Sequence, residues 1–194
     1  MIMKAFVINL DSRPDRLKLF QEQSFPFEVK RVPGVVASCG EDGCTLSHLN
    51  ILKQQKNFPF VIFEDDCTLI QSWGVVEKAM KQLPKDWDAL WLGATLKRPL
   101  KRYSTNLYRL NKAYTLHAVI YNSKKMVDHI VKKHNVASGV NLDVFYKFFV
   151  QPRFKCFITY PMVATQRSDI SDIGGEQTIN EQYILDKYTY YTNK

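Results

Sequence analysis

Short apolar runs alternate along the chain with longer segments in which apolar residues recur every three or four positions. The runs are typical of strands buried in a sheet, and the spaced pattern is typical of helices that pack one face against it. Expected strands cover residues 4–10, 28–32, 60–63, 89–94, 107–110, 114–121 and 155–160. Expected helices cover 13–20, a segment from Asp42 or Thr45 to about Asn57, 72–83, 123–134, and a segment from Asn141. We expect irregular structure from Pro161 onward.

This alternation predicts an α/β fold with a mainly parallel central sheet flanked by helices. Strands 107–110 and 114–121 are candidates for a directly paired hairpin. The 194 residues contain no internal repeat, no low-complexity tract and no convincing linker. The sequence therefore predicts a single domain over residues 1–194.

Three consecutive acids, Glu64, Asp65 and Asp66, follow the apolar run 60–63. In open α/β sheets, ligands bind outside the carboxyl ends of the strands. Three carboxylates there repel one another and lose hydration, and a divalent cation offsets both costs; oxygen ligands favour Mg²⁺ or Mn²⁺, which also bridge phosphates. A solvated strand end explains the triplet alone equally well, and phosphatases, nucleases and receiver domains also place acids after an apolar strand.

The formal net charge of +8 indicates an anionic partner. Basic residues gather between Lys97 and Lys112 and again between Lys124 and Lys133. Such runs suit an acidic acceptor, peripheral contact with a membrane surface, or nucleic acid, although no nucleic-acid recognition motif is present. The chain contains neither a transmembrane stretch of about 20 apolar residues nor a signal-peptide pattern, so we expect a cytoplasmic protein.

Three segments resemble the signature blocks of a known family in order and spacing: VINLDSRPDRL (7–17), GCTLSHLNIL (43–52) and VIFEDDC (61–67). Weaker matches are DWDALWLG (86–93), AYTLHAVIYNSKKMVDHIV (113–131), NLD (141–143) and YPMVATQRSDISDI (160–173). Together they resemble glycosyltransferase family 25, the lipooligosaccharide galactosyltransferases with their collagen-modifying and viral relatives. The resemblance covers nearly the whole chain.

The resemblance implies a GT-A-type fold, whose nucleotide-binding half is Rossmann-like, and a UDP-sugar donor. It also implies a divalent metal, Mn²⁺ or Mg²⁺, held by the acidic motif. The expected reaction moves a hexose, galactose or glucose, to a hydroxyl of a glycan or glycoconjugate with inversion at the anomeric carbon.

The resemblance also implies roles for individual acids. Asp143 matches the family's later acid and is the candidate catalytic base, although it could serve only to stabilise the first turn of its helix. The implied metal ligands are Asp65, Asp66 and Asp172. Asp169 stands in the same Ser-Asp-Ile context as Asp172 and is the alternative match.

Contacts with the nucleotide sugar are implied for Asn9, Leu10, Arg13, Arg16, Ser47, His48, Glu64 and Asp65. Backbone groups at Asn9 and Leu10 could pair with a nucleobase, and Arg13 and Arg16 could neutralise a diphosphate. The alternative for both arginines is surface ion pairing with nearby aspartates. His48 equally fits a purely structural role.

Two other functions are compatible with the sequence. A catalytically inactive module that binds nucleotide sugars would carry the same motifs. A basic nucleic-acid-binding protein would explain the net charge of +8. It would bind DNA or RNA with a steep dependence on salt.

Overall fold

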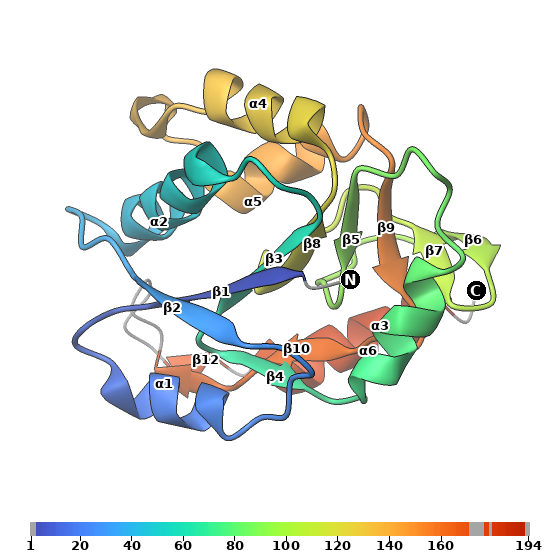
Figure 1. The fold of residues 1–194 in the computed structure, drawn as a ribbon, viewed down its shortest axis with the longest axis horizontal. Helices are drawn as coiled ribbons and strands as arrows, with labels where there is room; N and C mark the ends of the chain where they lie inside the picture. The colour runs from blue at the N-terminus through green and yellow to red at the C-terminus, as the bar shows by residue number, and fades with distance from the viewer. Residues whose placement is uncertain (1–2, 171–176, 179, 193–194) are drawn as a thin grey trace.

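The computed structural model describes residues 3–170, 177–178 and 180–192, and an eight-stranded sheet forms its centre (Figure 1). The strands lie in the order β2-β1-β3-β8-β5-β9-β7-β6. Their bounds are β1 (Lys4–Asn9), β2 (Val29–Pro33), β3 (Phe60–Glu64), β5 (Ala89–Trp91), β6 (Lys101–Ser104), β7 (Leu107–Arg109), β8 (Ala118–Tyr121) and β9 (Cys156–Thr159). Strands β7 and β8 run opposite to the other strands. The predicted GT-A-type α/β class, with a mainly parallel sheet, is confirmed.

Alternate residues of the central strands supply the two faces of the sheet. In β3, Phe60 and Ile62 join the core beneath α2 (Gly40–Gln54), α4 (Lys124–Lys133) and α5 (Leu142–Phe145). Val61 and Phe63 join the opposite core, which packs against α1 (Pro14–Gln21) and α3 (Trp73–Met80). The helices therefore cover both faces, as Figure 1 shows.

Strands β1, β2 and β3 run parallel and end at the same edge of the sheet. Their last residues are Asn9, Pro33 and Glu64. The chain beyond each strand turns sharply, so the polar residues that follow are gathered at one place. This edge carries the candidate site.

Several sequence expectations about the elements were wrong. Strand β7 pairs with β6 and β9, so it forms no hairpin with β8, and residues 114–117 lie outside β8. The helix α2 begins earlier than expected, at Gly40. The short strand β4 (Cys67–Leu69) was not expected either, and it pairs with β10 (Ala164–Gln166).

The segment after Pro161 is not irregular. It contains β10, then β11 (Asp169–Ile170), β12 (Gln177–Thr178) and the helix α6 (Asn180–Thr192). Helix α6 buries Ile184 and Tyr188, which lie one turn apart, and packs the partly buried Leu185 and Tyr191 against the same core. Within the described ranges, no helix has the combination of length and apolarity that a bilayer crossing requires.

Two glycines provide a matched test of this packing. A Cβ on Gly93 would lie 1.8 Å from the carbonyl oxygen of Ala164, a backbone atom that cannot move aside without disturbing the edge of the sheet. Gly93→Ala should therefore lower the free energy of unfolding by more than about 2 kcal/mol in urea denaturation. Gly74→Ala on α3 meets only the Ser72 hydroxyl at 3.6 Å. It should stabilise the protein by up to about 1 kcal/mol, and equal effects at both positions would contradict this account.

Candidate functional site

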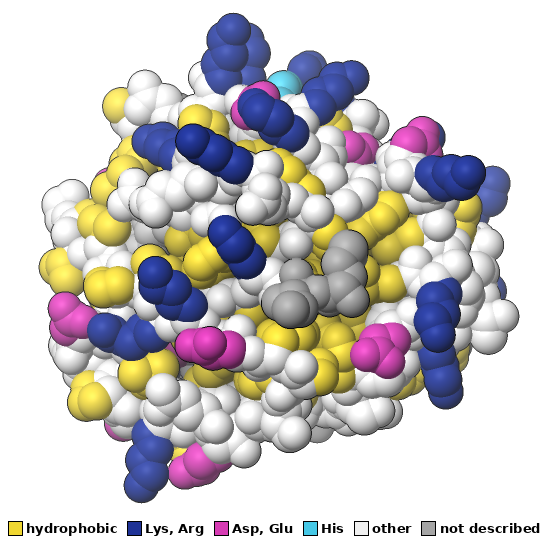
Figure 2. Space-filling model, viewed as in Figure 1, with side chains coloured by type: hydrophobic (Ala, Val, Ile, Leu, Met, Phe, Trp, Pro, Cys, Tyr) yellow, Lys and Arg dark blue, Asp and Glu magenta, His cyan; other side chains and the backbone are white. Residues whose placement is uncertain are grey.

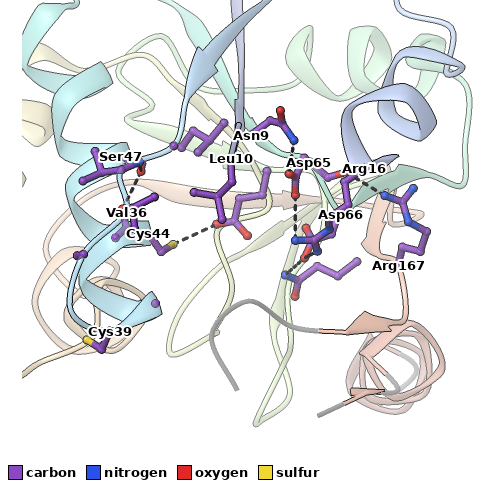
Figure 3. A pocket seen from close by; sticks show the side chains of 18 of the residues that line it. Asn9, Leu10, Arg16, Val36, Cys39, Cys44, Ser47, Asp65, Asp66 and Arg167 are labelled. Atoms are coloured by element: carbon purple, nitrogen blue, oxygen red, sulfur yellow. Dashed lines mark hydrogen bonds and ion pairs between the residues drawn. The ribbon is translucent and has the colours of Figure 1, made fainter. Parts of the chain in front are cut away.

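A cavity of about 530 Å³ opens at the carboxyl ends of β1, β2 and β3. One wall is formed by the ends of β1 and β3, and the opposite wall by α2 and the loop that precedes it (Figure 3). The lining residues include Asn9, Leu10, Arg16, Gly34, Val35, Val36, Cys44, Ser47, Glu64, Asp65, Asp66, Gln166 and Arg167. The cavity thus combines an apolar loop wall with a strongly charged wall.

The charged wall is organised around Arg16, which α1 presents to the acids that follow β3. Its guanidinium lies 3.2 Å from Asp65 Oδ1 and 3.3 Å from Asp66 Oδ2. Figure 3 shows Arg16 pointing at both acids. Because the Arg16 and Asp65 side chains are only 10% and 9% exposed, solvent screens this pair weakly.

Asn9 fixes the second oxygen of Asp65. Its amide donates to Asp65 Oδ2 at 2.8 Å and to the Arg13 carbonyl at 2.8 Å. The amide oxygen of Asn9 accepts a bond of 2.9 Å from Arg31 Nε, and Arg31 also pairs with Asp11. Both carboxylate oxygens of Asp65 are therefore occupied by protein groups, and burial raises its pKa despite the opposing charge of Arg16.

Glu64 is held from behind by α2. Nε2 of His48 lies 2.9 Å from Glu64 Oε1, and Cys44 Sγ lies 4.0 Å from the same oxygen. Burial alone would raise the pKa of Glu64. The hydrogen bond with His48, followed by the electrostatic effects of His48, His117 and Arg16, instead holds the pKa of Glu64 below its ordinary value. Glu64 is thus ionised at neutral pH.

Asp66 has the least compensation of the three acids. Burial, followed by the negative charge of Glu64, raises its pKa to about 7, although Arg16 acts in the opposite direction. Oδ2 accepts from Gln166 at 3.3 Å, whereas Oδ1 is buried without a hydrogen-bond partner among the described residues. A buried carboxylate oxygen without a partner costs free energy. Asp66 and Glu64, two hard oxygen donors beside a cavity, therefore fit a divalent cation such as Mg²⁺ or Mn²⁺.

A second, smaller cavity of about 250 Å³ adjoins the first and shares Cys44, Glu64 and Gln166 with it. Asp143, at the start of α5, lines the second cavity. Burial raises its pKa, although a backbone hydrogen bond from Val144 lowers it. The candidate base thus lies on the other side of Glu64 from the Asp66 carboxylate.

The structure brings most of the predicted residues together. Asn9, Leu10, Arg16, Ser47, Glu64, Asp65 and Asp66 all line the first cavity. Ser47 accepts from the Val35 amide at 2.8 Å and donates to Gly43, which ties the apolar loop to α2. Arg13 and His48 do not line the cavity: Arg13 pairs with Asp15, and His48 is fully buried behind Glu64.

Asp172 lies outside the described residues, so its expected role stays a prediction. Three site residues were not identified from the sequence: Arg31, Gln166 and Arg167. Arg167 donates to the Asp65 carbonyl at 3.1 Å, and its own amide donates to the Asp66 carbonyl at 2.8 Å. In the sequence, Gln166 and Arg167 were marked only by their place within the YPMVATQRSDISDI match. Arg31 was marked only by its place at the end of an expected strand.

A model of glycosyltransferase family 25, described as an LPS biosynthesis protein family, matches residues 29–142, more than half of the chain. The chain belongs to glycosyltransferase family 25. Membership places the chain in a class of glycosyltransferases, and the matched span contains the acidic triplet, the apolar loop and most of α2 and its cavity wall. No curated protein sequence matches the chain significantly.

Solved structures support the fold of this family 25 member. The crystal structure of A197 from STIV matches with a TM-score of 0.52, covering 87% of each chain at 12% identity. A putative glucose-1-phosphate thymidylyltransferase from Bacillus anthracis gives a TM-score of 0.47 at 12% identity, covering 83% of this chain and 69% of its own. At such identities the first match shows the fold alone, and the second adds no argument.

The raised pKa of Asp66 predicts how stability depends on pH. In the unfolded chain Asp66 ionises near its ordinary value of 3.8, and in the folded chain near 7. Between these values the folded chain holds a proton that the unfolded chain has lost, so this group lowers stability as pH rises. Asp66→Asn should therefore raise the free energy of unfolding at about pH 8, without added metal, by about 1–3 kcal/mol.

Near pH 2.5, below both pKa values, the same substitution should change the free energy of unfolding by less than about 0.5 kcal/mol, since Asp66 is then almost fully protonated in both states. Urea denaturation at the two pH values measures the difference. The matched control is Asp128→Asn, because Asp128 is exposed on α4 and, within the part of the chain that the structure describes, pairs only with Lys124. If the free energy of unfolding of Asp66→Asn depended on pH in the same way as that of the wild type, the claim that burial raises the pKa of Asp66 would be wrong.

Proposed function

We propose that this family 25 protein is a metal-dependent, inverting glycosyltransferase that moves a hexose, galactose or glucose, from a UDP-sugar to a glycan hydroxyl. The observation that carries the proposal is the buried Asp66 carboxylate, whose Oδ1 lacks a partner among the described residues, beside a 530 Å³ cavity. A cation that bridges this carboxylate to a diphosphate would remove the deficit. The choice of UDP and of a hexose rests on the family resemblance.

The two walls of the cavity suit the two halves of a nucleotide sugar. The apolar wall of Leu10, Val35 and Val36 offers a surface for the flat base and ribose. The charged wall offers Arg16 and Arg167 to the diphosphate. Arg16 lies on α1 and Arg167 follows β10, and both line the cavity beside the acids, where they can contact the anionic half of a donor.

Asp66 and Glu64 would hold the divalent cation. When bound, it supplies positive charge at the oxygens of the leaving diphosphate. Asp65 is a weaker candidate ligand than the sequence suggested, because Asn9 and Arg16 already occupy both of its oxygens. Its better-supported role is to position Arg16 for the diphosphate.

Asp143 would act as the base from the second cavity. The acceptor hydroxyl passes its proton to the Asp143 carboxylate as its oxygen attacks the anomeric carbon, and the bond from that carbon to the diphosphate oxygen breaks. The electron pair of the broken bond leaves with the UDP. A pKa that burial raises makes Asp143 a stronger base than a solvated aspartate.

Donor binding should require both the cation and Asp66. We expect UDP-galactose or UDP-glucose to raise the melting temperature by several degrees with Mn²⁺ present and by much less without it, since the cation bridges protein and diphosphate. Asp66→Ala should abolish the Mn²⁺-dependent part of the rise. The Asp128→Ala control should keep it, and a response to UDP-sugar that is indifferent to Mn²⁺ in the wild type would overturn the metal-dependent reading.

Loss of the base should separate donor binding from transfer. Asp143→Asn keeps the shape of the side chain, so the thermal response to UDP-sugar and Mn²⁺ should stay unchanged. Transfer of the labelled sugar to a panel of glycans should fall by about 100-fold or more. Retention of wild-type transfer rates in Asp143→Asn would remove this residue from the base role.

A catalytically inactive module that binds nucleotide sugars is the second candidate. The observation in its favour is that Arg16 pairs with both Asp65 and Asp66, which gives the acids a protein cation. Such a module would bind UDP-sugar without hydrolysing it or passing it to any glycan. Hydrolysis of the UDP-sugar, measured with Mn²⁺ and without acceptor, distinguishes the transferase from the inactive module. An active transferase slowly transfers the sugar to water and so produces free UDP, whereas the module does not.

A further inference from the structure

Two lysines meet around Tyr114, whose neighbour in the chain, Thr115, lines the second cavity. The Lys147 ammonium donates to the hydroxyl of Tyr114, and the Lys97 ammonium lies 5.7 Å from the centroid of the Tyr114 ring. Lys97 also donates to the hydroxyl of Tyr183 at 2.8 Å. Among the described residues, both ammonium groups are therefore engaged by tyrosines rather than by carboxylates. Neither lysine forms an ion pair with a carboxylate of the residues that the structure describes.

The lysines come from distant parts of the chain, so their approach is a property of the fold. Lys97 follows β5, Lys147 lies on the π-helical turn η2 (Tyr146–Val150) that continues α5, and Tyr183 lies on α6. Lys97 is exposed, and Lys147 is half-buried. A free ammonium pair beside exposed aromatic surface suits an anionic sugar, because rings stack on the sugar and ammonium groups bind its charge.

The loop that carries Tyr114 is held in a strained conformation. Thr115 has a φ of +73°, and for a β-branched residue this left-handed region costs about 1–3 kcal/mol. The loop is pinned by Trp91, whose indole donates to the Thr115 carbonyl at 3.2 Å, and by a backbone bridge between Tyr114 and Thr95. A strained backbone that the surroundings hold in place is typical of functional sites.

The same loop contacts the candidate base. A backbone hydrogen bond from Thr115 reaches Asp143 and lowers its pKa against the effect of burial, and Lys147 also lowers it by its charge. Lys147 follows Asp143 by one helical turn, a spacing that brings side chains to within about 5–6 Å at their Cβ atoms. Thr115 and Asp143 both line the second cavity. The cluster around Tyr114 is therefore adjacent to the cavity that Asp143 lines, and Lys147 is close enough to act on the Asp143 carboxyl by its charge.

We propose that Lys97 and Lys147, arranged around Tyr114, bind a negatively charged group of the acceptor, a phosphate or carboxylate carried within about one sugar unit of the hydroxyl that accepts the hexose. This inference rests on the proposed function, because it takes the second cavity as the acceptor side. It deepens that function by giving the acceptor a chemical class, an anionic saccharide. Other basic groups, such as those on α4 that Figure 2 shows along the upper edge, belong to a different surface.

The test measures binding of three monosaccharide probes by NMR titration: galactose 6-phosphate, galacturonate and neutral galactose. In the wild type, the charged probes should bind at least about 10-fold more tightly than galactose, as expected for charge-assisted hydrogen bonds. Lys97→Met with Lys147→Met should reduce that preference to about 2-fold or less. The matched control is Lys125→Met on α4, an exposed lysine of the other surface, which should keep the wild-type preference.

Each outcome decides the proposal. Tighter binding of both charged probes assigns the subsite to negative charge in general, and tighter binding of the phosphate alone assigns it to phosphate. No preference in the wild type, or a preference that the double variant keeps, overturns it. The thermal response of the double variant to UDP-galactose and Mn²⁺ is measured in parallel, and its loss would assign the lysines to the donor and equally overturn the proposal.

Failure of the proposed function gives a different result from failure of this inference. If the wild type shows no response to any UDP-sugar but the charged probes still depend on Lys97 and Lys147, the donor assignment fails and the anion subsite stands. If the UDP-sugar binds but the charged and neutral probes bind equally well, the donor assignment stands and the anion subsite fails. The melting temperature of each variant without ligand serves as the control for folding. We expect the Lys97 substitution to leave the core intact, because Lys97 is exposed.

Discussion

The site depends on one electrostatic constraint: three consecutive acids leave the end of β3 and a single buried arginine faces two of them. Arg16 contacts Asp65 and Asp66, while Glu64 turns to His48 on α2. One guanidinium cannot neutralise three carboxylates that have lost most of their hydration. The remaining deficit falls on Asp66, whose pKa is raised to about 7. The fold tolerates this cost at the end of β3, which opens onto the cavity of about 530 Å³.

Much of this arrangement could be predicted because it depends on short-range patterns. A four-residue apolar run followed by three acids specifies a buried strand and the polarity of its end, whatever surrounds it. The parallel order of β1, β2 and β3 then brings Asn9 and the acids to one edge. The family match over residues 29–142 agrees with those same segments.

What could not be predicted depends on contacts between distant residues. Gln166 and Arg167 reach the acids only because β10 pairs with β4, and neither three-residue strand has a pattern that distinguishes it from a loop. Helix α6 was missed although Ile184, Leu185, Tyr188 and Tyr191 follow a helical spacing and pack on the core, because polar residues interrupt this short pattern. His48 points toward Glu64 and away from the cavity because of how α2 is rotated about its axis. The sequence does not fix that rotation, because it defines the first residue of the helix only to within a few positions.

Glu64 connects the two cavities and sets the chemistry of both. His48 keeps it ionised, and its negative charge is among the causes that raise the pKa of both Asp66 and Asp143. His48, which lines neither cavity, therefore affects Asp66 and Asp143 through Glu64. When positive charge collects beside Asp66, the field of Glu64 at Asp143 is partly cancelled, and the affinity of Asp143 for a proton falls. In the proposed function, a cation bound beside Asp66 would thus be coupled to the proton affinity of Asp143 through the shared Glu64 carboxylate, because burial leaves the charges of all three acids weakly screened.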